Sequence, residues 1–387
     1  MRFLYGVICC VALVYTSSCT VSRFLTQAAA GQWQLNRRSQ PIDELLAQPT
    51  TSAEIRARLS QLEFVKAYGS RHGLLMHKNY RDYIQLDQPY VVWFVNGSHP
   101  LAFLPLTFSF PIVGSFPGLS WFDEQRAISF KEQLEAGGWD VNLRGVTAFS
   151  TGGWFRDPVL SSMYFDHPAQ VGYFANTILH EPVHATVLVP DQQYFNESLA
   201  SFVADTMTPP FLAEAYKNSP ETRAAYEETR KTGEYIIERL LATFKELEAV
   251  YQSERSDEAK LAAKTKIIDR LMAEIPFPVR PNNATLIGFQ LYQEGTKEFE
   301  ELFAACGQQW PAFLDAVDSL HPDHFNEPQT MDIGATVRLL SARKCRPFPK
   351  LAAHRMQTKQ QRQRDAHRRR ALAQPTRTLN GKLPSAQ

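Results

Sequence analysis

Residues 171–205 read VGYFANTILHEPVHATVLVPDQQYFNESLASFVAD and contain an HExxH motif, His180-Glu181-Pro182-Val183-His184. Residues four apart on an α-helix share one face, so both histidines can direct their imidazoles at one metal ion. Glu181 can then act as the general base that takes a proton from the water that the metal activates. A catalytic zinc site needs a third protein ligand. Glu197, in the second helical pattern of this stretch, is the best candidate.

Ser201 lies one helical turn beyond Glu197, where its hydroxyl could hydrogen-bond a ligand histidine. Simpler interpretations exist for each of these residues. The two histidines could be partly buried side chains satisfied by their neighbours. Glu197 could be an ordinary first-turn carboxylate stabilised by the helix dipole. The motif on an amphipathic helix, followed closely by a second helix with an acid, favours one bound Zn²⁺ per chain.

Pro182 is unexpected inside such a motif. It lacks a backbone donor, and its ring clashes with the carbonyl of Ile178, at a cost of about 3 kcal/mol in a helix interior. We therefore expect one of two outcomes. Either the helix kinks at Pro182 and re-aims His184, or the site has lost its activity.

The N-terminus carries a targeting segment. Arg2 precedes an apolar run from Phe3 to Tyr15, too short to span a bilayer comfortably. Residues 1–18 resemble a bacterial lipoprotein signal, after which Cys19 becomes the lipid-bearing first residue; ordinary signal cleavage or an uncleaved anchor are the alternatives. Thr20 is not the aspartate associated with inner-membrane retention. We expect an exported protein, lipid-anchored at the periplasmic face of the outer membrane.

Cysteine usage agrees with export. Of the five cysteines, Cys9 and Cys10 leave with the signal and Cys19 would carry the lipid. Cys306 and Cys345 could form a disulfide in an oxidising compartment. No cysteine pair has the spacing of a zinc site, so any metal depends on histidine and carboxylate.

The C-terminal residues 351–387 carry nine Lys or Arg against one Asp and few apolar residues. We predict a disordered basic tail. Such a tail can contact an anionic envelope surface, or it can be a solvated extension without a partner. Nucleic acid is not an expected partner of an exported protein.

The hydropathy pattern predicts an α+β fold that is mostly helical. After a membrane-proximal lead at residues 19–50, we expect one metallopeptidase domain at 51–350. It comprises a small antiparallel or mixed sheet at about 88–150, metal helices at 170–206, and a helical part at 210–320. That last part contains a helical hairpin, with helices that begin at Ser219 and near Ser256.

Smaller elements are predicted from local signals. Amphipathic spacing and caps predict helices at Ser52–Tyr68, Asp123–Ala136, Asn283–Glu294 and Pro311–Ser319. Alternation predicts strands from Tyr90 and at Asp140–Ser150. Asn96-Gly97 reads as a turn, the segment from Phe110 to Gly118 as a loop, and Pro209-Pro210 as the end of the second metal helix.

Several motifs together resemble the bacterial putative aminopeptidase lipoprotein family and, more broadly, the gluzincin metallopeptidases. The resemblance covers most of residues 19–320. It rests on Cys19, Gly31-Gln32, Leu104–Gly114, AFSTGGWFRDPVLS at Ala148–Ser161, HEPVH, FNESLASFV, and Asn282-Asn283-Ala284 with Tyr292. It implies a zincin-like domain, zinc ligands at His180, His184 and Glu197, and a catalytic glutamate at Glu181.

The chain also departs from that family. The family usually has HELAHQ, so Pro182 and Ala185 differ, and a cysteine pair expected near the FPxxG run is replaced by Ser109 and Ser115. A catalytically impaired homologue that acts as a binding or scaffold lipoprotein of the envelope is therefore the alternative function.

The favoured function is zinc-dependent hydrolysis of peptide bonds in the cell envelope. The transition-state oxyanion needs a donor besides zinc. Tyr292 and Tyr173 are candidates, although either could be a packed tyrosine. The strand at Asp140–Ser150 could pair with an extended substrate backbone. Only the family name favours an aminopeptidase, since the residues leave exo- and endo-cleavage open.

Overall fold

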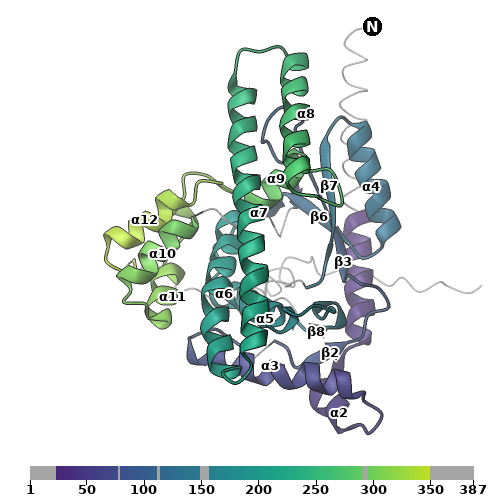
Figure 1. The fold of residues 1–387 in the computed structure, drawn as a ribbon, viewed down its shortest axis with the longest axis vertical. Coiled ribbons are helices and arrows are strands. Elements are labelled where there is room, and N and C mark those ends of the chain that lie inside the picture. The colour runs from purple at the N-terminus through teal and green to yellow at the C-terminus, as the bar shows by residue number, and fades with distance from the viewer. Residues whose placement is uncertain (1–22, 77–78, 111–113, 149–156, 291–294, 349–387) are drawn as a thin grey trace, which may run out of the picture. The chain divides into compact units, whose positions relative to one another are not determined.

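The computed structural model describes residues 23–76, 79–110, 114–148, 157–290 and 295–348 (Figure 1). All of them except Phe348 belong to one compact unit that ends at Pro347. This unit is mostly helical, with small mixed and antiparallel sheets, so the predicted α+β class is confirmed. The signal segment, Cys19, Tyr292 and the basic tail lie outside the described residues.

The N-terminal part packs on the rest of the unit. Residues 23–37 form a helix, whose buried Gln27 side chain donates to the carbonyl of Ser120 (3.1 Å) and accepts from the amide of Phe122 (3.1 Å). Helices α2 (Ile42–Ala47) and α3 (Ala53–Arg71) follow. Of the two residues that could cap α3, Thr51 and Ser52, it is Ser52 whose hydroxyl accepts from the amide of Ile55.

Two sheets support the central helices. The first is mixed, with order β1 (Gln40–Pro41), β2 (Asp82–Ile84) and β8 (Val159–Leu160). The second is antiparallel, with β3 (Val92–Ser98) between β6 (Gly118–Trp121) and β7 (Asp140–Val146). Helix α4 (Glu124–Ala136), in the predicted place and capped by Asp123, covers the second sheet. The core between them contains Trp93, Val95, Leu119, Trp121 and Phe130.

The predicted turn at Asn96-Gly97 is wrong. Both residues continue β3 and pair with Asn142 and Val141 of β7. The Asn96 side chain explains the difference, because it donates to the carbonyl of Ala284 (2.8 Å) and accepts from Asn142 (3.1 Å). These tertiary contacts outweigh the local turn signal.

The loop predicted from Phe110 to Gly118 is only partly correct. Residues 111–113 lie outside the description, but β5 (Gly114–Phe116) pairs with β4 (Phe108–Phe110) and β6 begins at Gly118. In this pairing Ser109 lies opposite Ser115. The two positions at which the family resemblance implies a cysteine pair are therefore direct neighbours across the two strands.

Two long helices form the centre of the unit. Helix α5 covers Gln170–Thr186 and α6 covers Gln193–Ala215. The predicted end of α6 before Pro209 is wrong, since the helix continues through Pro209 and Pro210. Met207, Phe211 and Leu212 are buried on this last part. Burial of these side chains stabilises the helix against the loss of two backbone donors.

The predicted helical hairpin is confirmed. Helix α7 (Pro220–Gln252) and α8 (Asp257–Glu274) lie side by side (Figure 1), and α9 (Asn283–Gln290) packs against the C-terminal half of α7. Helix α8 begins after Ser256, whose hydroxyl caps it, whereas Ser219 at the start of α7 makes no side-chain cap hydrogen bond. An apolar cluster joins the three helices and includes Phe103, Phe244, Leu247, Ile268 and Leu286.

Three further helices complete the unit: α10 (Thr296–Ala305), α11 (Trp310–Asp318) and α12 (Gly334–Ala342). Sequence analysis found α11 but missed α10 and α12. The disulfide that the sequence allowed is present: Cys306 after α10 is bonded to Cys345 after α12, with 5.1 Å between their Cα atoms.

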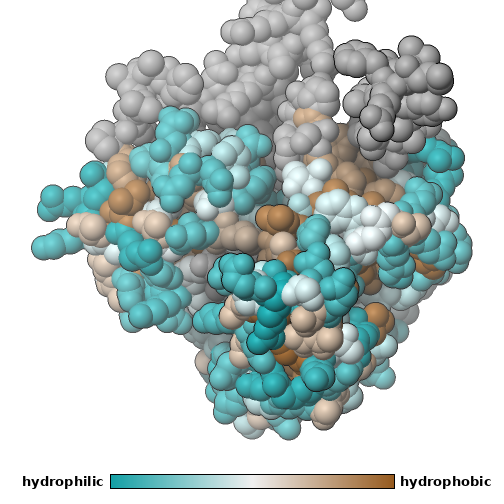
Figure 2. Space-filling model, turned by 90° about the horizontal axis from the view of Figure 1, so that it is seen from above, coloured by the Kyte–Doolittle hydropathy of each residue, from teal (hydrophilic) through white to brown (hydrophobic). Residues whose placement is uncertain are grey.

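Among the described residues, no helix has the length and apolar content needed to span a membrane. The face shown in Figure 2 is largely hydrophilic, and hydrophobic residues occur there in small groups between polar ones. Buried apolar side chains occur in the two clusters given above and also in the central helices, for example Phe174, Ile178 and Phe195.

Candidate metal centre

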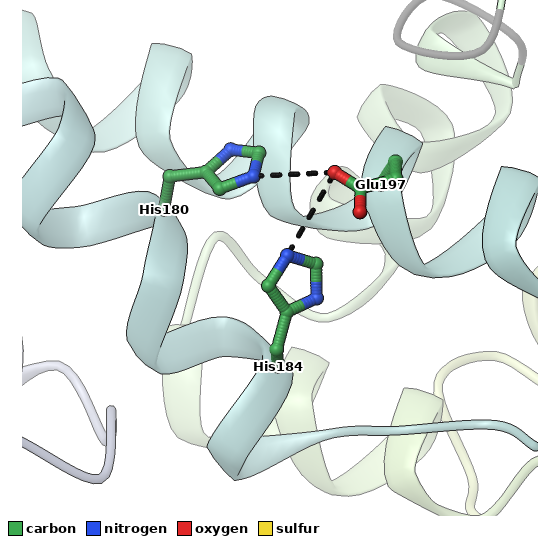
Figure 3. A group of neighbouring side chains, drawn as sticks. All are labelled: His180, His184 and Glu197. Carbon is green, nitrogen blue, oxygen red and sulfur yellow. Dashed lines mark ion pairs between the residues drawn. The ribbon is translucent and has the colours of Figure 1, made fainter. Parts of the chain in front are cut away.

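Three side chains predicted as metal ligands converge between α5 and α6 (Figure 3). The Nε2 atoms of His180 and His184 lie 3.5 Å and 3.8 Å from the same carboxylate oxygen of Glu197. One potential ligand atom from each residue falls within a group no wider than 4.8 Å. Among the described residues, this is the one group of histidine, cysteine and acid with such geometry, and it could hold a metal ion.

The local structure explains this convergence. His180 and His184 are one turn apart in α5, so they share the face that contacts α6. The segment that leads into α6 is fixed by Asn196, whose side chain accepts from the amide of Val189 (2.9 Å) and donates to its carbonyl (2.8 Å). These two hydrogen bonds place Glu197 in the first turns of α6, opposite the histidines. Asn196 therefore has a structural role that its position beside Glu197 did not reveal.

Pro182 does not interrupt α5. The helix continues from Gln170 to Thr186, and His184 still faces Glu197, so the expected re-aiming of His184 is not observed. Ile178, Leu179 and Val183 are fully buried around the proline. Their packing holds the helix on its neighbours and offsets the lost backbone hydrogen bond. The carbonyl of Pro182 accepts from the Thr186 hydroxyl (2.8 Å).

The electrostatics of the group favour an ionised carboxylate. Burial alone would raise the pKa of Glu197, but the charge of His184 and the hydrogen bond with His180, together with the charges of His180 and Arg144, lower this pKa to about 2. For His180, burial would lower the pKa, but Glu197 and nearby acids raise it. An anionic oxygen therefore faces two imidazoles, which is the donor set of a zinc site.

Glu181 is in a different environment from Glu197. Its side chain is buried, and burial raises its pKa to about 7; the charge of His180 lowers it, and those of Glu197 and Asp157 raise it further. Asp157 is itself buried and accepts a hydrogen bond from Asn79 (2.9 Å). Sequence analysis missed Asp157, because no local signal connects it with the HExxH helix.

Asp205, on α6, is a second acid near the histidines that the sequence did not single out. Its carboxylate accepts from the Asn176 side chain (2.8 Å), and Asn176 lies one turn before His180 on α5. The charge of Asp205 contributes to the raised pKa of His180. The residue is exposed, yet burial by surrounding atoms is the first cause that raises its own pKa. Asp205 is therefore accessible to solvent but enclosed.

The remaining predicted residues are not joined to this group by a hydrogen bond. Ser201 is half-buried one turn beyond Glu197, and none of the hydrogen bonds within the described residues involves its hydroxyl, so its contact with a histidine stays a prediction. Tyr173 packs against Phe165 and Tyr226. Tyr292, the other candidate oxyanion donor, lies outside the described residues.

A comparison with protein families decides which family this chain represents. Residues 23–330 match the model of the family described as "Putative aminopeptidase". The chain belongs to this family. The match includes His180, Glu181, His184 and Glu197 and ends before α12 and Cys345. The family resemblance found in the sequence is confirmed in this coarser form, and the family description supports a peptidase-like function.

Searches of curated proteins and of solved structures found no significant match. The function of this family member must therefore be argued from the geometry of its own site.

Proposed function

We propose that this protein is a zinc-dependent peptidase of the bacterial cell envelope that acts as an aminopeptidase. The observation that carries the proposal is the convergence of His180, His184 and Glu197 beside a buried Glu181. Two imidazoles and a carboxylate are a common ligand set of catalytic zinc, which keeps another position open for water or substrate.

The spacing of the three side chains fits such an ion. Ligand atoms on one tetrahedral zinc lie roughly 3.3 Å apart, because each bond is about 2.0–2.1 Å long. The two distances from Glu197 to the histidine nitrogens, 3.5 Å and 3.8 Å, are close to this value. When bound, zinc polarises the substrate carbonyl and makes water a stronger nucleophile at neutral pH.

Glu181 is the proposed general base. Its carboxylate takes the proton of the attacking water and later delivers it to the nitrogen of the leaving amine. A base works best when its pKa lies near the operating pH, and burial raises the pKa of Glu181 to about 7. The same burial limits competing bulk water around this carboxylate.

Strand β7 is the proposed docking edge for substrate. It pairs with β3 on one side, and no described strand pairs with its other side. The backbone of an extended peptide can add to such an edge. Arg144 of β7 influences the pKa of Glu197, so part of the strand is electrostatically coupled to the metal ligands.

Asp205 is the proposed anchor for the free amine that distinguishes an aminopeptidase substrate. Its carboxylate is accessible, and no Lys, Arg or His of the described residues forms an ion pair with it. It lies near Asn176, one helical turn, or about 5 Å along the axis, from His180. An ammonium group here would gain a charge-assisted hydrogen bond close to the scissile carbonyl.

The envelope location rests on the N-terminal sequence. We propose that residues 1–18 direct export, that Cys19 carries a lipid, and that the chain is anchored to the outer membrane on its periplasmic face. The basic tail is proposed to contact the anionic envelope surface. Globomycin-sensitive processing and labelling with a palmitate analogue, both lost in Cys19→Ala, would test the anchor.

Metal analysis of the purified chain is the first test of activity. We expect about one zinc per chain in the wild type, loss of zinc in His180→Ala, and retention in the control His324→Ala, whose histidine lies in the turn after α11 and is not part of the ligand group. Hydrolysis of a peptide library should then require zinc. A chain that binds no zinc and cleaves no peptide would exclude the proposal.

The free-amine preference has its own test. Peptides with a free N-terminus should be cleaved and N-acetylated copies should not. Asp205→Asn should raise KM for free peptides by tenfold or more, because the amine loses its charged partner. Equal cleavage of free and acetylated peptides would instead indicate an endopeptidase.

The impaired-homologue alternative depends on Pro182. If zinc binds but hydrolysis is absent, and Pro182→Leu restores it, the natural chain is a binding protein rather than an enzyme. If the wild type is active and Pro182→Leu changes kcat by less than about threefold, the proline is compatible with catalysis.

A further inference from the structure

The first turn of α6, which leads to Glu197, is held by a segment from far along the chain. Residues 325–329, which precede α12, lie against residues 191–195 at the start of α6. Asp191 and Gln329 both have φ of 56°, in the left-handed region that residues other than glycine rarely occupy. Such strain persists only where the surrounding contacts fix the backbone, and it occurs often at functional sites.

Three hydrogen bonds join the two segments. The amide of Gln329 donates to the carbonyl of Asp191 (2.8 Å). The side-chain oxygen of Gln329 accepts from the amide of Gln193 (2.9 Å). The buried side chain of Gln192 donates to the carbonyl of Glu327 (2.8 Å). These bonds fix the consecutive residues with which α6 begins.

Apolar packing supports the same contact. The rings of Phe325 and Phe195 meet edge to face, with 5.2 Å between their centroids, and both side chains are buried. Phe195 also packs against Phe299 of α10, at 5.8 Å. The segment 325–329 therefore contacts both the backbone and the side chains of the first turn of α6.

Gln329 supplies a cap that the residues next to α6 do not. The first amides of a helix have no partner within the helix, and Gln192 at the N-cap position makes no side-chain cap hydrogen bond. The oxygen of Gln329, 136 positions along the chain, accepts from the amide of Gln193 instead. Glu197 lies about one turn after Gln193. The capped turn is therefore the one that leads to the third candidate ligand.

We propose that Gln329 is a positioning residue for Glu197. By fixing the first turn of α6, it sets the place from which the Glu197 carboxylate reaches the same point as His180 and His184, and so it raises the affinity of the site for zinc. A ligand that is already in place loses less conformational freedom when the metal binds. The inference rests on the proposed zinc site and not on which peptide is cleaved.

Gln329→Ala tests the inference, because it removes the oxygen that caps α6. The chain offers a matched control in Ser256→Ala, which removes the cap of α8, a helix without a candidate metal ligand. Both variants should lower the melting temperature of the zinc-free protein to a similar extent, since each loses one cap. Only Gln329→Ala should raise the Kd for zinc, by roughly tenfold, in a competition with a chelating dye.

Two further variants sharpen the test. Gln329→Glu keeps an oxygen that can accept from the Gln193 amide, so its Kd for zinc should stay within about threefold of the wild-type value. Gln192→Ala removes the bond to Glu327 but leaves the cap, and it should raise the Kd by less than Gln329→Ala does. If Gln329→Ala does not fold, a wild-type Kd in Gln192→Ala overturns the inference.

The remaining outcomes separate the inference from the proposed function. If the wild type binds zinc and Gln329→Ala keeps its Kd within about twofold, the inference is wrong and the proposed function stands. Equal losses of affinity in Gln329→Ala and Ser256→Ala would also overturn it, because they would reflect a general loss of stability. A loss in Gln329→Glu as large as that in Gln329→Ala would contradict capping by the side-chain oxygen. If the wild type binds no zinc, the proposed function fails and the inference falls with it.

Discussion

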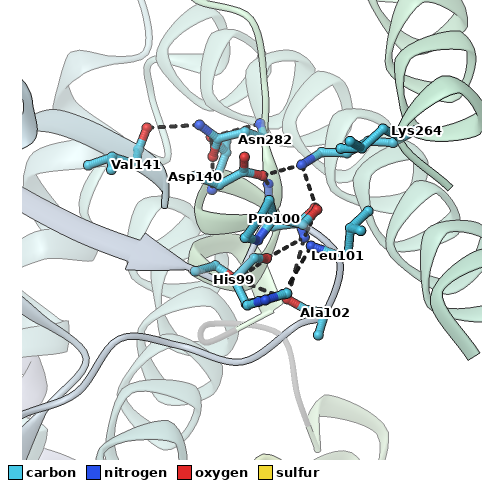
Figure 4. A network of polar contacts seen from close by, with 12 residues as sticks. His99, Pro100, Leu101, Ala102, Asp140, Val141, Lys264 and Asn282 are labelled. Atoms are coloured by element: carbon cyan, nitrogen blue, oxygen red, sulfur yellow. Dashed lines mark hydrogen bonds and ion pairs between the residues drawn. The ribbon is translucent and has the colours of Figure 1, made fainter. Parts of the chain in front are cut away.

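Two groups of polar side chains in this protein differ in how completely their hydrogen bonds are satisfied. Around Asn283, which is fully buried, the side-chain oxygen accepts from Tyr251 (2.8 Å) and the amide nitrogen donates to the carbonyls of His99 (2.9 Å) and Pro100 (3.2 Å). Asp140 accepts from Lys264 and from the amide of Asn283 (Figure 4). This network joins the last turn of α7 and the middle of α8 to β7 and to the residues that follow β3.

The group between α5 and α6 lacks such closure. Glu197 faces two imidazoles, and none of the hydrogen bonds within the described residues involves the buried carboxylate of Glu181. A saturated buried network stabilises one structure, whereas three convergent ligand atoms of the kind found here can hold a metal ion. Both regions contain motif residues of the family resemblance, so membership of a motif does not by itself mean catalysis. Asn282 and Asn283 are structural.

The largest expected effect separates the two regions by activity. Glu181→Gln keeps the shape of the side chain but removes its basicity, so kcat should fall by a factor of about 10²–10⁴ while zinc content stays at about one per chain. Asn283→Ala should leave kcat per folded molecule unchanged. Peptide hydrolysis by zinc-loaded protein measures both. Unchanged hydrolysis in Glu181→Gln would assign the proton transfer to another group.

The second prediction concerns acid stability of the metal-free protein. The pKa of Glu197 falls from an ordinary 4.5 to about 2 on folding, so its ionised form stabilises the fold above pH 4.5. This contribution, about 3 kcal/mol at most, should be lost as the pH falls from 4.5 to 2. Urea unfolding across this range should show a shallower loss in Glu197→Gln. Identical curves would show that the carboxylate is not held by the histidines.

The third prediction tests the saturated network. Asn283→Ala leaves the Tyr251 hydroxyl without its acceptor and two carbonyls without their donor, and it should lower the free energy of unfolding by about 2–3 kcal/mol. The exposed Asn36 is the control, and Asn36→Ala should change it by less than about 0.5 kcal/mol. A loss of zinc in Asn283→Ala, with the fold intact, would contradict a purely structural role.

The smallest effect is expected at the edge of the same network. Lys264→Met removes the ion pair with Asp140, although Asp140 still accepts a hydrogen bond from the amide of Asn283. The change should lower the free energy of unfolding by about 1 kcal/mol. The pair between Lys297 and Glu301 is far more exposed, and Lys297→Met should have no measurable effect. Equal effects of the two changes on the free energy of unfolding in urea would mean that the Lys264–Asp140 pair stabilises the protein no more than an exposed ion pair does.

Local signals predicted the elements whose ends are set by their own residues. Ser52, Asp123 and Ser256 each cap a helix that was predicted to begin there, because a side-chain oxygen can satisfy the first free amides. The failures share another cause. Asn96-Gly97 has a strong local preference for a turn, but hydrogen bonds between β3 and β7 override it. Pro209-Pro210 has a strong local preference for a helix end, but burial of the neighbouring side chains of α6 overrides it.

The sequence by itself determined the three candidate ligands, because helical spacing places His180 and His184 on one face and a second helix supplies Glu197 within a short connection. It also determined the helical hairpin and allowed the disulfide. Only the tertiary structure decided that Pro182 stays inside an unbroken helix and that Asn283 closes a structural network. It also decided that the charges of Asp157 and Asp205 act on Glu181 and His180. Those contacts join residues far apart in the chain, and local periodicity carries no information about which distant side chains meet.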